Sequence, residues 1–206
     1  MTSEHPNSGA ISGNRPGSCD VAFKEWASVI LALERGKQGV LLRKGGMDEE
    51  DGAFRIAYPR FLLFPTYEHQ DPRLVKPQFA SLISESVHSQ DDKGRIPISS
   101  FAEIQADYQT ERREQAYGLL DQLIWNERYL DSRFTFQPER PLHVMLVRVY
   151  RLPNPTLVEF KSEYAGCRSW VTFDSPLSLE GAVPALSDIV FGSLQKKLRQ
   201  LFVEQE

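Results

Sequence analysis

Residues 143–152 read HVMLVRVYRL and are the strongest strand signal in this chain. The stretch is apolar and rich in β-branched side chains, and prolines at 141 and 153 bound it, which predicts a strand within a sheet. Arg148 is the exception in it, because burying a guanidinium without a partner costs several kcal/mol. We therefore expect Arg148 to face a polar cavity, or to pair with a carboxylate such as Glu68, and we treat it as a candidate binding residue.

Helices and further strands are predicted on both sides of this strand. Apolar side chains at helical spacing predict a helix over residues 21–35. Ser187 is a good N-cap for a C-terminal helix, in which we expect Ile189 and Val190 to be buried. The other predicted helices are 73–89, 111–124 and 126–134, and the other predicted strands are 39–43, 60–64, 96–101, 157–161 and 167–173.

These elements do not alternate as strand–helix–strand units, which argues against a doubly wound sheet. The sequence instead predicts an α+β fold, with a small mixed or closed sheet flanked by helices. Pro65 is expected to end the 60–64 strand, because proline cannot donate to a central ladder. Residues 1–19 are rich in Ser, Gly, Asn and Pro, so we expect a disordered tail there and one α+β domain over residues 20–206.

Composition narrows the classes of function. The formal net charge is −4, so the chain as a whole does not attract nucleic acid or anionic lipid. A local basic patch is present, because residues 128–168 hold seven Lys or Arg against four Asp or Glu. No apolar run approaches the ~20 residues of a membrane helix. Two cysteines without a CxxC pair, and no signal peptide, predict a cytoplasmic protein with no structural zinc and no membrane partner. We expect no cofactor.

The first candidate site follows the predicted strand at 39–43. Arg43 and Lys44 stand at the strand end, directly before two glycines at 45 and 46. Two cations beside an open backbone can hold a phosphate or a carboxylate. The alternative is a solvated strand end with a turn. The glycines do not form a Walker motif, which needs Gly-Lys-Ser/Thr before a helix.

The second candidate site follows the apolar run at 60–64. Thr66, Tyr67, Glu68, His69 and Gln70 all carry groups that make directional hydrogen bonds. Such density just past a strand end is typical of a binding or catalytic site. Glu68 and His69 can act as acid and base. Adjacent residues on a strand point to opposite faces, however, so the alternative is a structural role in closing the loop.

Three weaker signals complete the set of candidates. Cys167 can act as a nucleophile if His69 is its base, or it can be a small buried side chain in a strand. Trp170 can stack on a flat ligand or belong to the core. The stretch 159–161, Glu-Phe-Lys, matches half of a nuclease site that binds magnesium, with Asp131 as the upstream acid. Such three-residue matches are common by chance.

Several stretches of the chain resemble the family called domain of unknown function 1802. They are KEWA at 24–27, LLRKGG at 41–46, RFLLFPTYEHQ at 60–70, RVYRL at 148–152 and YAGCRSWV at 164–171. The resemblance spans about residues 21–173, and it implies no assigned activity. Members of the family occur beside or fused to restriction-endonuclease-like domains. This implies a link to restriction–modification and a restriction-endonuclease-like partner.

A second resemblance concerns the GxKxxExR pattern of ASCH domains, which have a PUA-like barrel. Gly36 and Arg43 match the pattern, whereas Gln38 replaces its lysine and Leu41 its glutamate. The resemblance implies a PUA-like barrel flanked by helices. It also implies a cleft that holds a nucleobase or a nucleic acid. The two charged groups that the catalytic role of ASCH domains would need are both missing in this chain.

Two functions of different class follow. In the first, the protein is a binding module for nucleic acid or a nucleobase. Arg43 and Lys44 contact phosphate, Tyr67 or Trp170 stacks on a base, and the side chains of 68–70 read the base edge. In the second, it is a hydrolase, nuclease-like, that uses Glu68 and His69 with or without a metal. Salt-dependent binding without turnover separates the first from the second.

Overall fold

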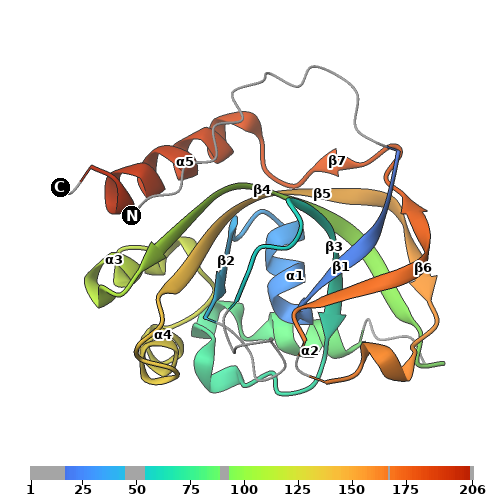
Figure 1. Cartoon of the computed structure of the whole chain (residues 1–206), viewed down its shortest axis with the longest axis horizontal. Helices are drawn as coiled ribbons and strands as arrows, with labels where there is room; N and C mark the ends of the chain where they lie inside the picture. The colour runs from blue at the N-terminus through green and yellow to red at the C-terminus, as the bar shows by residue number, and fades with distance from the viewer. Residues whose placement is uncertain (1–16, 45–53, 89–92, 167, 205–206) are drawn as a thin grey trace.

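The computed structural model describes residues 17–44, 54–88, 93–166 and 168–204 (Figure 1). Within these residues the chain forms one mixed sheet and five α-helices, which confirms the predicted α+β class. The strands are β1 (Ser18–Trp26), β2 (Val40–Arg43), β3 (Arg60–Thr66), β4 (Ile96–Thr110), β5 (Leu142–Val158), β6 (Trp170–Ser178) and β7 (Val183–Pro184). The helices are α1 (Ala27–Glu34), α2 (Ser81–His88), α3 (Arg113–Tyr117), α4 (Glu127–Thr135) and α5 (Asp188–Phe202).

The sheet has the strand order β2-β5-β4-β3-β1-β6, and β7 pairs with β5. The β1–β3 pair is parallel, and the other pairs are antiparallel. The ladder described does not close on itself, since it runs from β2 at one edge to β6 at the other. Instead, Arg43 at the end of β2 donates a hydrogen bond to the Lys24 carbonyl of β1. A side chain thus joins the two sides of a curved sheet that is not a closed barrel.

The helix predicted over residues 21–35 is correct only for its second half. Residues 18–26 form β1, so Ser18 and Cys19, placed in the tail by the sequence, belong to a strand. β1 lies between β3 and β6, with Ala22 in one hydrophobic cluster and Phe23 in another. Because this strand is buried on both faces, its apolar residues do not alternate, and their spacing imitates that of a helix.

The strands around β5 are longer than the sequence predicts. Segment 143–152 and the first two residues of segment 157–161 lie in a single strand, β5, that continues past Pro153 and ends at Val158, so the strand predicted to reach residue 161 is wrong beyond 158. The β4–β5 register shifts between Ile98 and Ser100, and residues 152–155 lie in that irregularity. The ladder therefore needs no N–H from Pro153. Likewise β3 continues through Pro65, because β3 pairs with β4 only at 60–62 and its end needs hydrogen bonds on one side only.

Two predicted helices are shorter than expected. The helix predicted at 73–89 begins at Ser81, and two 3-10 turns at 72–74 and 77–79 precede it, each starting at a proline. The helix predicted at 111–124 is reduced to α3, which ends at Tyr117, and a 3-10 turn follows at 120–122. The predictions at 126–134 and after Ser187 are confirmed by α4 and α5, and the Ser187 hydroxyl accepts a hydrogen bond from the Val190 N–H.

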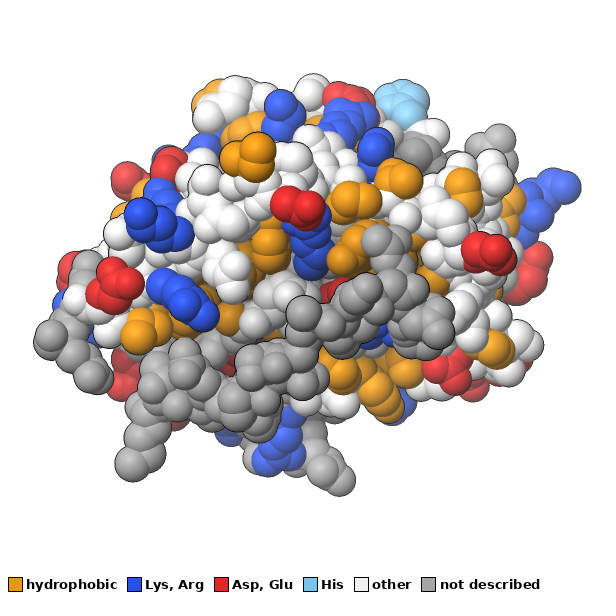
Figure 2. All heavy atoms as spheres, turned by 90° about the horizontal axis from the view of Figure 1, so that it is seen from above, with side chains coloured by type: hydrophobic (Ala, Val, Ile, Leu, Met, Phe, Trp, Pro, Cys, Tyr) orange, Lys and Arg blue, Asp and Glu red, His pale blue; other side chains and the backbone are white. Residues whose placement is uncertain are grey.

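Helices cover the sheet on both sides, with α1 on one side of β4 and β5 and α5 on the other (Figure 1). α5 buries Phe191, Leu194 and Leu198. Ile189 and Val190, predicted to be buried, are exposed at the start of α5, and Ile189 keeps 84% of its surface in solvent. Figure 2 views this side and shows apolar side chains scattered among charged ones. Among the helices described, none is both long enough and apolar enough to span a membrane.

Candidate functional site

Two of the predicted site segments meet at the end of β1. The Arg43 guanidinium, from the end of β2, lies 3.2 Å from a carboxylate oxygen of Glu25. Thr66, from the end of β3, donates its hydroxyl to the Glu25 carbonyl at 3.1 Å. The strand order explains this, because β3 runs parallel to β1 and ends beside it, while β2 approaches from the far edge of the curved sheet.

Glu25 is the buried acid of this site, and the sequence did not single it out. It is 5% exposed, and its Oε1 accepts a hydrogen bond from the Trp26 N–H at 2.8 Å. Burial raises the pKa of Glu25 because the charged form loses its water, and the positive charge of Arg43 acts in the opposite direction. A carboxyl group in this position can hold or accept a proton beside a guanidinium.

Helix α4 brings a second cation and a tyrosine to the same place. The Arg133 guanidinium lies 5.2 Å from the Tyr129 ring centroid, and the Tyr129 ring stacks on Trp125 at 3.9 Å. Arg133 and Arg43 both act electrostatically on Glu25 and on Tyr129. Arg133 forms no ion pair within the part of the chain that the structure describes. We call Glu25, Arg43, Tyr129 and Arg133 the Glu25 cluster.

Asn126 fixes the start of α4 and thereby the position of the cluster. Its side-chain oxygen accepts a hydrogen bond from the Tyr129 N–H at 3.3 Å, which is the usual role of an N-cap. Its amide group donates to the carbonyls of Arg73 and Val75 at 2.8 and 3.3 Å. One asparagine therefore holds both the helix and the chain segment before α2.

Lys44 lies next to Arg43 but is buried rather than exposed. It is 3% exposed, and its ammonium group lies 5.2 Å from the Phe134 ring centroid. Burial is the main cause that lowers the pKa of Lys44, and Arg113 and Arg133 act in the same direction. Arg113 packs on the same ring from α3 at 5.4 Å and pairs with Asp131. Phe134 thus holds two cations near the Glu25 cluster.

A histidine and an aspartate form a pair beside Arg43. His143 of β5 is the ladder partner of Arg43, and its Nδ1 lies 2.9 Å from Oδ2 of Asp107 on β4. Both side chains are partly exposed, at 13% and 18%. The Phe54 ring packs edge-on against the imidazole, with centroids 5.2 Å apart. Neither residue was a candidate from the sequence, because their pairing depends on the register between two strands.

Trp170 opens β6 and packs against the aromatic core on the Arg43 side. Its ring centroid lies 4.8 Å from that of Phe23 and 5.2 Å from that of Phe61. Its indole N–H donates to the Arg55 carbonyl at 3.2 Å. The Arg43 guanidinium also packs on the Phe23 ring, 4.5 Å from its centroid. Trp170 and Arg43 are therefore neighbours through Phe23, and Trp170 is largely a core residue.

The rest of the 66–70 run is divided between structure and solvent. The Gln70 oxygen accepts a hydrogen bond from the Ser28 N–H in the first turn of α1 at 2.9 Å, and its amide donates to the Ser86 hydroxyl of α2 at 3.1 Å. Tyr67 is partly buried. Glu68 and His69 are both exposed, and His69 adopts a left-handed backbone with φ 64°. Within the described residues neither joins the Glu25 cluster, so the predicted acid–base pair does not converge on it.

Arg148 lies on the opposite face of the sheet from Arg43. It stands five positions after His143 on β5, and an odd number of positions reverses the face. Its partner is Asp188 at 2.5 Å, and not Glu68, while the Phe191 ring of α5 packs against it at 4.7 Å. Arg148 therefore anchors α5 and does not share the site of Arg43.

The nuclease pattern is not assembled. Asp131 pairs with Arg113 and accepts a hydrogen bond from the Tyr117 hydroxyl at 2.6 Å. Lys161 pairs with Asp174 of β6. The part of the chain with described positions holds no group of three His, Cys, Asp or Glu side chains that could bind a metal. Cys167, for which the sequence left open a nucleophile or a small buried side chain, lies outside the described residues.

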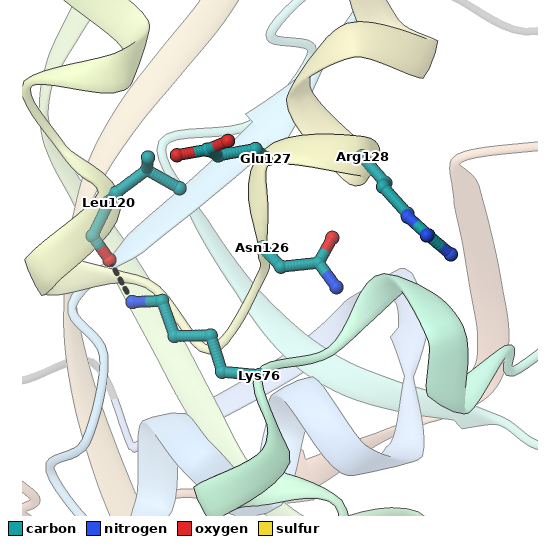
Figure 3. Close-up of a pocket in the computed structure, with 5 residues that line it drawn as sticks. All are labelled: Lys76, Leu120, Asn126, Glu127 and Arg128. Carbon is teal, nitrogen blue, oxygen red and sulfur yellow. Dashed lines mark hydrogen bonds between the residues drawn. The ribbon is translucent and has the colours of Figure 1, made fainter.

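A shallow pocket lies next to α4 (Figure 3), with a volume of about 360 Å³. Lys76, Leu120, Asn126, Glu127 and Arg128 line it. The Lys76 ammonium donates to the carbonyls of Leu120 and Leu123, and Asn126 caps α4. Burial lowers the pKa of Lys76. Lys76 and Asn126 already serve the fold, so we place the candidate site at the Glu25 cluster.

Comparison with known proteins gives a family and a set of distant structures. The family model of the domain of unknown function DUF1802 matches residues 22–197, so the chain belongs to this family, as its sequence motifs predicted. No curated protein matches the chain significantly.

The structural similarity is to ASCH proteins of Zymomonas mobilis. The crystal structure of ASCH from this organism shares 13% identity and a TM-score of 0.43, covering 88% of this chain and 94% of that one. A serine-to-alanine mutant gives 10% identity and a TM-score of 0.45, over 85% of this chain and 94% of that one. A tyrosine-to-phenylalanine mutant gives 13% and 0.42, over 85% and 96%.

Proposed function

We propose that this protein binds nucleic acid at the Glu25 cluster. The observation that carries the proposal is Arg133, a cation stacked on a tyrosine with no carboxylate partner in the described chain. With Glu25 ionised, Arg43 and Arg133 leave one positive charge in excess. This local excess contrasts with the overall charge of −4, and a phosphate group complements it.

The geometry of Arg133 suits phosphate binding better than that of an arginine held in a surface ion pair. A guanidinium that packs its flat face on an aromatic ring keeps its N–H groups free in the plane, where they bind phosphate oxygens in pairs. The Tyr129 ring lies under Arg133, and the Phe136 ring lies 5.8 Å from it. The two rings restrict the side chain, so less conformational entropy is lost on binding.

An exposed aromatic side chain next to Trp170 supports a ligand that carries bases. Tyr58 is 39% exposed, and its ring packs edge-on against Trp170 at 5.4 Å. Bases stack on such rings with a gain of about 1–3 kcal/mol each. Phosphate contacts from Arg133 and stacking on Tyr58 together favour a single-stranded nucleic acid over a small anion.

DNA is the first ligand to test. The resemblance of the sequence implies a link to restriction–modification and a restriction-endonuclease-like partner, and both remain part of this proposal. The predicted cytoplasmic location is consistent with either DNA or RNA as the ligand.

The test measures binding of a fluorescent single-stranded oligonucleotide over a range of salt concentrations. We expect binding to weaken with salt, and Arg133→Gln to flatten the slope of log K against log salt by about 0.7, the value for one phosphate contact on a single strand. Arg133 is partly exposed and forms no ion pair with the residues that the structure describes, so its replacement should leave the fold intact.

The matched control is Arg151→Gln. Arg151 is exposed and lies eight positions beyond His143 on β5, which is about 26 Å at about 3.3 Å per residue. The Arg151→Gln variant should show the wild-type slope of log K against log salt. Absence of binding at low salt, or equal slopes for the Arg133 and Arg151 variants, would overturn the proposed function.

A further inference from the structure

His143 and Asp107 are a polar pair beside Arg43 that the proposed function does not yet use. His143 contributes little to the hydrophobic core, and its ring is held from two sides, by Asp107 and by Phe54. Such an arrangement fixes the direction of both ring nitrogens.

The partner of Nδ1 determines where the imidazole carries its proton. Asp107 Oδ2 lies 2.9 Å from His143 Nδ1, and an ionised carboxylate can only accept a hydrogen bond. In the neutral imidazole Nδ1 therefore holds the proton, and Nε2 is an acceptor. His143 Nε2 has no hydrogen-bond partner within the described residues.

The neighbour of His143 supplies the complementary group. Arg43 and His143 are ladder partners, so their side chains point to the same face with Cβ atoms about 4.5–5.5 Å apart. Arg43 offers N–H donors and His143 Nε2 offers an acceptor. A flat heterocycle that carries a hydrogen-bond acceptor next to an N–H, such as a nucleobase, can bond to Arg43 and to His143 at once.

Asp107 is built to hold this tautomer rather than to neutralise a cation on the surface. Its other oxygen, Oδ1, is buried and makes no hydrogen bond with the described residues. A carboxylate with one oxygen unsatisfied depends more strongly on the N–H that it does receive. Asparagine has the same shape as aspartate but is uncharged and does not require an N–H on Nδ1. Asp107→Asn therefore tests the tautomer of His143 with little change in packing.

We propose that His143, oriented by Asp107, accepts a hydrogen bond from an N–H of a nucleobase while Arg43 donates to the adjacent acceptor of the same base. This inference rests on the proposed function, and it names the part of the ligand that the site recognises. His143 is the contact residue, and Asp107 is a positioning residue that acts through it.

The first test needs no ligand. Long-range proton–nitrogen NMR spectra of the ¹⁵N-labelled full-length protein at pH 8 report the tautomer of each imidazole. The His143 signals are assigned by their loss in His143→Phe. We expect the Nδ1-protonated tautomer in the wild type and a mixture of tautomers in Asp107→Asn. A wild-type His143 with its proton on Nε2 would overturn the inference.

The second test compares a single-stranded oligonucleotide with an abasic one of the same length. We expect His143→Phe to weaken binding of the base-bearing strand at least about fivefold, and to leave the abasic strand and the salt slope unchanged. Asp107→Asn should have a smaller effect of the same kind. His88→Phe, on the exposed surface of α2, is the control and should bind both strands as the wild type does.

The outcomes separate this inference from the proposed function. If the wild type binds oligonucleotides with the expected salt dependence but His143→Phe loses nothing on the base-bearing strand, the inference fails and the proposed function stands. If His143→Phe weakens both strands equally, the inference also fails, because a base contact cannot do that. If no oligonucleotide binds, both fail. Asp107→Asn decides the matter should His143→Phe not fold.

Discussion

Glu25 shows how a single acid can depend on one neighbour. It has almost no contact with water, and Arg43 is the cation in contact with it. Taking a carboxylate out of water is costly, and one guanidinium at 3.2 Å offsets that cost only in part. The net effect is a Glu25 pKa above the ordinary 4.5.

This shift predicts how stability depends on pH. The folded state binds the Glu25 proton more tightly than the unfolded state does. The stability from protonated Glu25 is therefore fully present below pH 4.5 and is lost as the pH rises through the pKa of the folded state. Urea unfolding of the wild type and of Glu25→Gln across this range should show the wild type losing stability, relative to the variant, as the pH increases.

Arg43→Met provides the matched comparison for Glu25. Arg43 is the cation in contact with Glu25, and its positive charge lowers the pKa of Glu25. Removing that charge should therefore raise this pKa further. The loss of stability should then extend to higher pH. A wild-type curve that stays parallel to the Glu25→Gln curve, or that gains on it with rising pH, would contradict this account.

At the scale of elements, the packing of α5 on the sheet depends on a glycine. A Cβ atom at Gly39, just before β2, would lie 2.5 Å from Leu194 of α5 and 3.3 Å from Leu186. Gly39→Ala should therefore force these side chains aside and destabilise the protein by about 1–3 kcal/mol. Denaturant unfolding followed by circular dichroism measures the change.

Gly192 is the natural control for Gly39. It lies within α5, and a Cβ there would meet no atom within 4 Å. Gly192→Ala should stabilise the protein by about 0.5–1 kcal/mol, because alanine favours a helix. Opposite signs for the two alanine variants are expected. Equal effects would mean that α5 does not pack on Gly39 as described.

Elements with local sequence signals were predictable, whereas elements that depend on distant strands were not. α4 and the start of α5 have local signals, namely helical spacing and caps at Asn126 and Ser187. β1 has no such signal, since its hydrogen-bonded neighbours β3 and β6 lie far away in the sequence and both of its faces are buried. The joining of β5 across Pro153 likewise depends on a register shift opposite it in β4, which no local pattern reports.

At the scale of the whole molecule, the sheet is open and Arg43 connects its two sides. The guanidinium contacts both the carboxylate of Glu25 and the carbonyl of Lys24 on β1. Arg43→Lys keeps the charge but cannot form both contacts in the same geometry. Hydrogen exchange should become faster in β2 and in the second half of β1, while the far end of the β4–β5 ladder, where 96–98 pair with 156–158, keeps its rates. Unchanged exchange in β2 would show that the contact adds nothing to closure.

The candidate site was predictable only as far as its segments. Arg43 and Thr66 stand in motifs that the sequence marks, and they do meet. Their meeting point, Glu25, lay in a predicted helix, and Arg133 and His143 reach the site through the placement of α4 and the register of β5. Contacts between distant segments depend on topology, which local composition does not encode. Arg148 was misplaced for the same reason, since its partner lies 40 residues away on α5.

The position of β1 between β3 and β6 has a consequence for synthesis on the ribosome. β1 is made early, but its two neighbours are β3 and β6, and β6 ends only at Ser178. A nascent chain that stops before β6 leaves one edge of an apolar strand without hydrogen-bond partners, and such edges recruit other strands. We therefore expect chaperones to hold nascent chains until β6 has emerged.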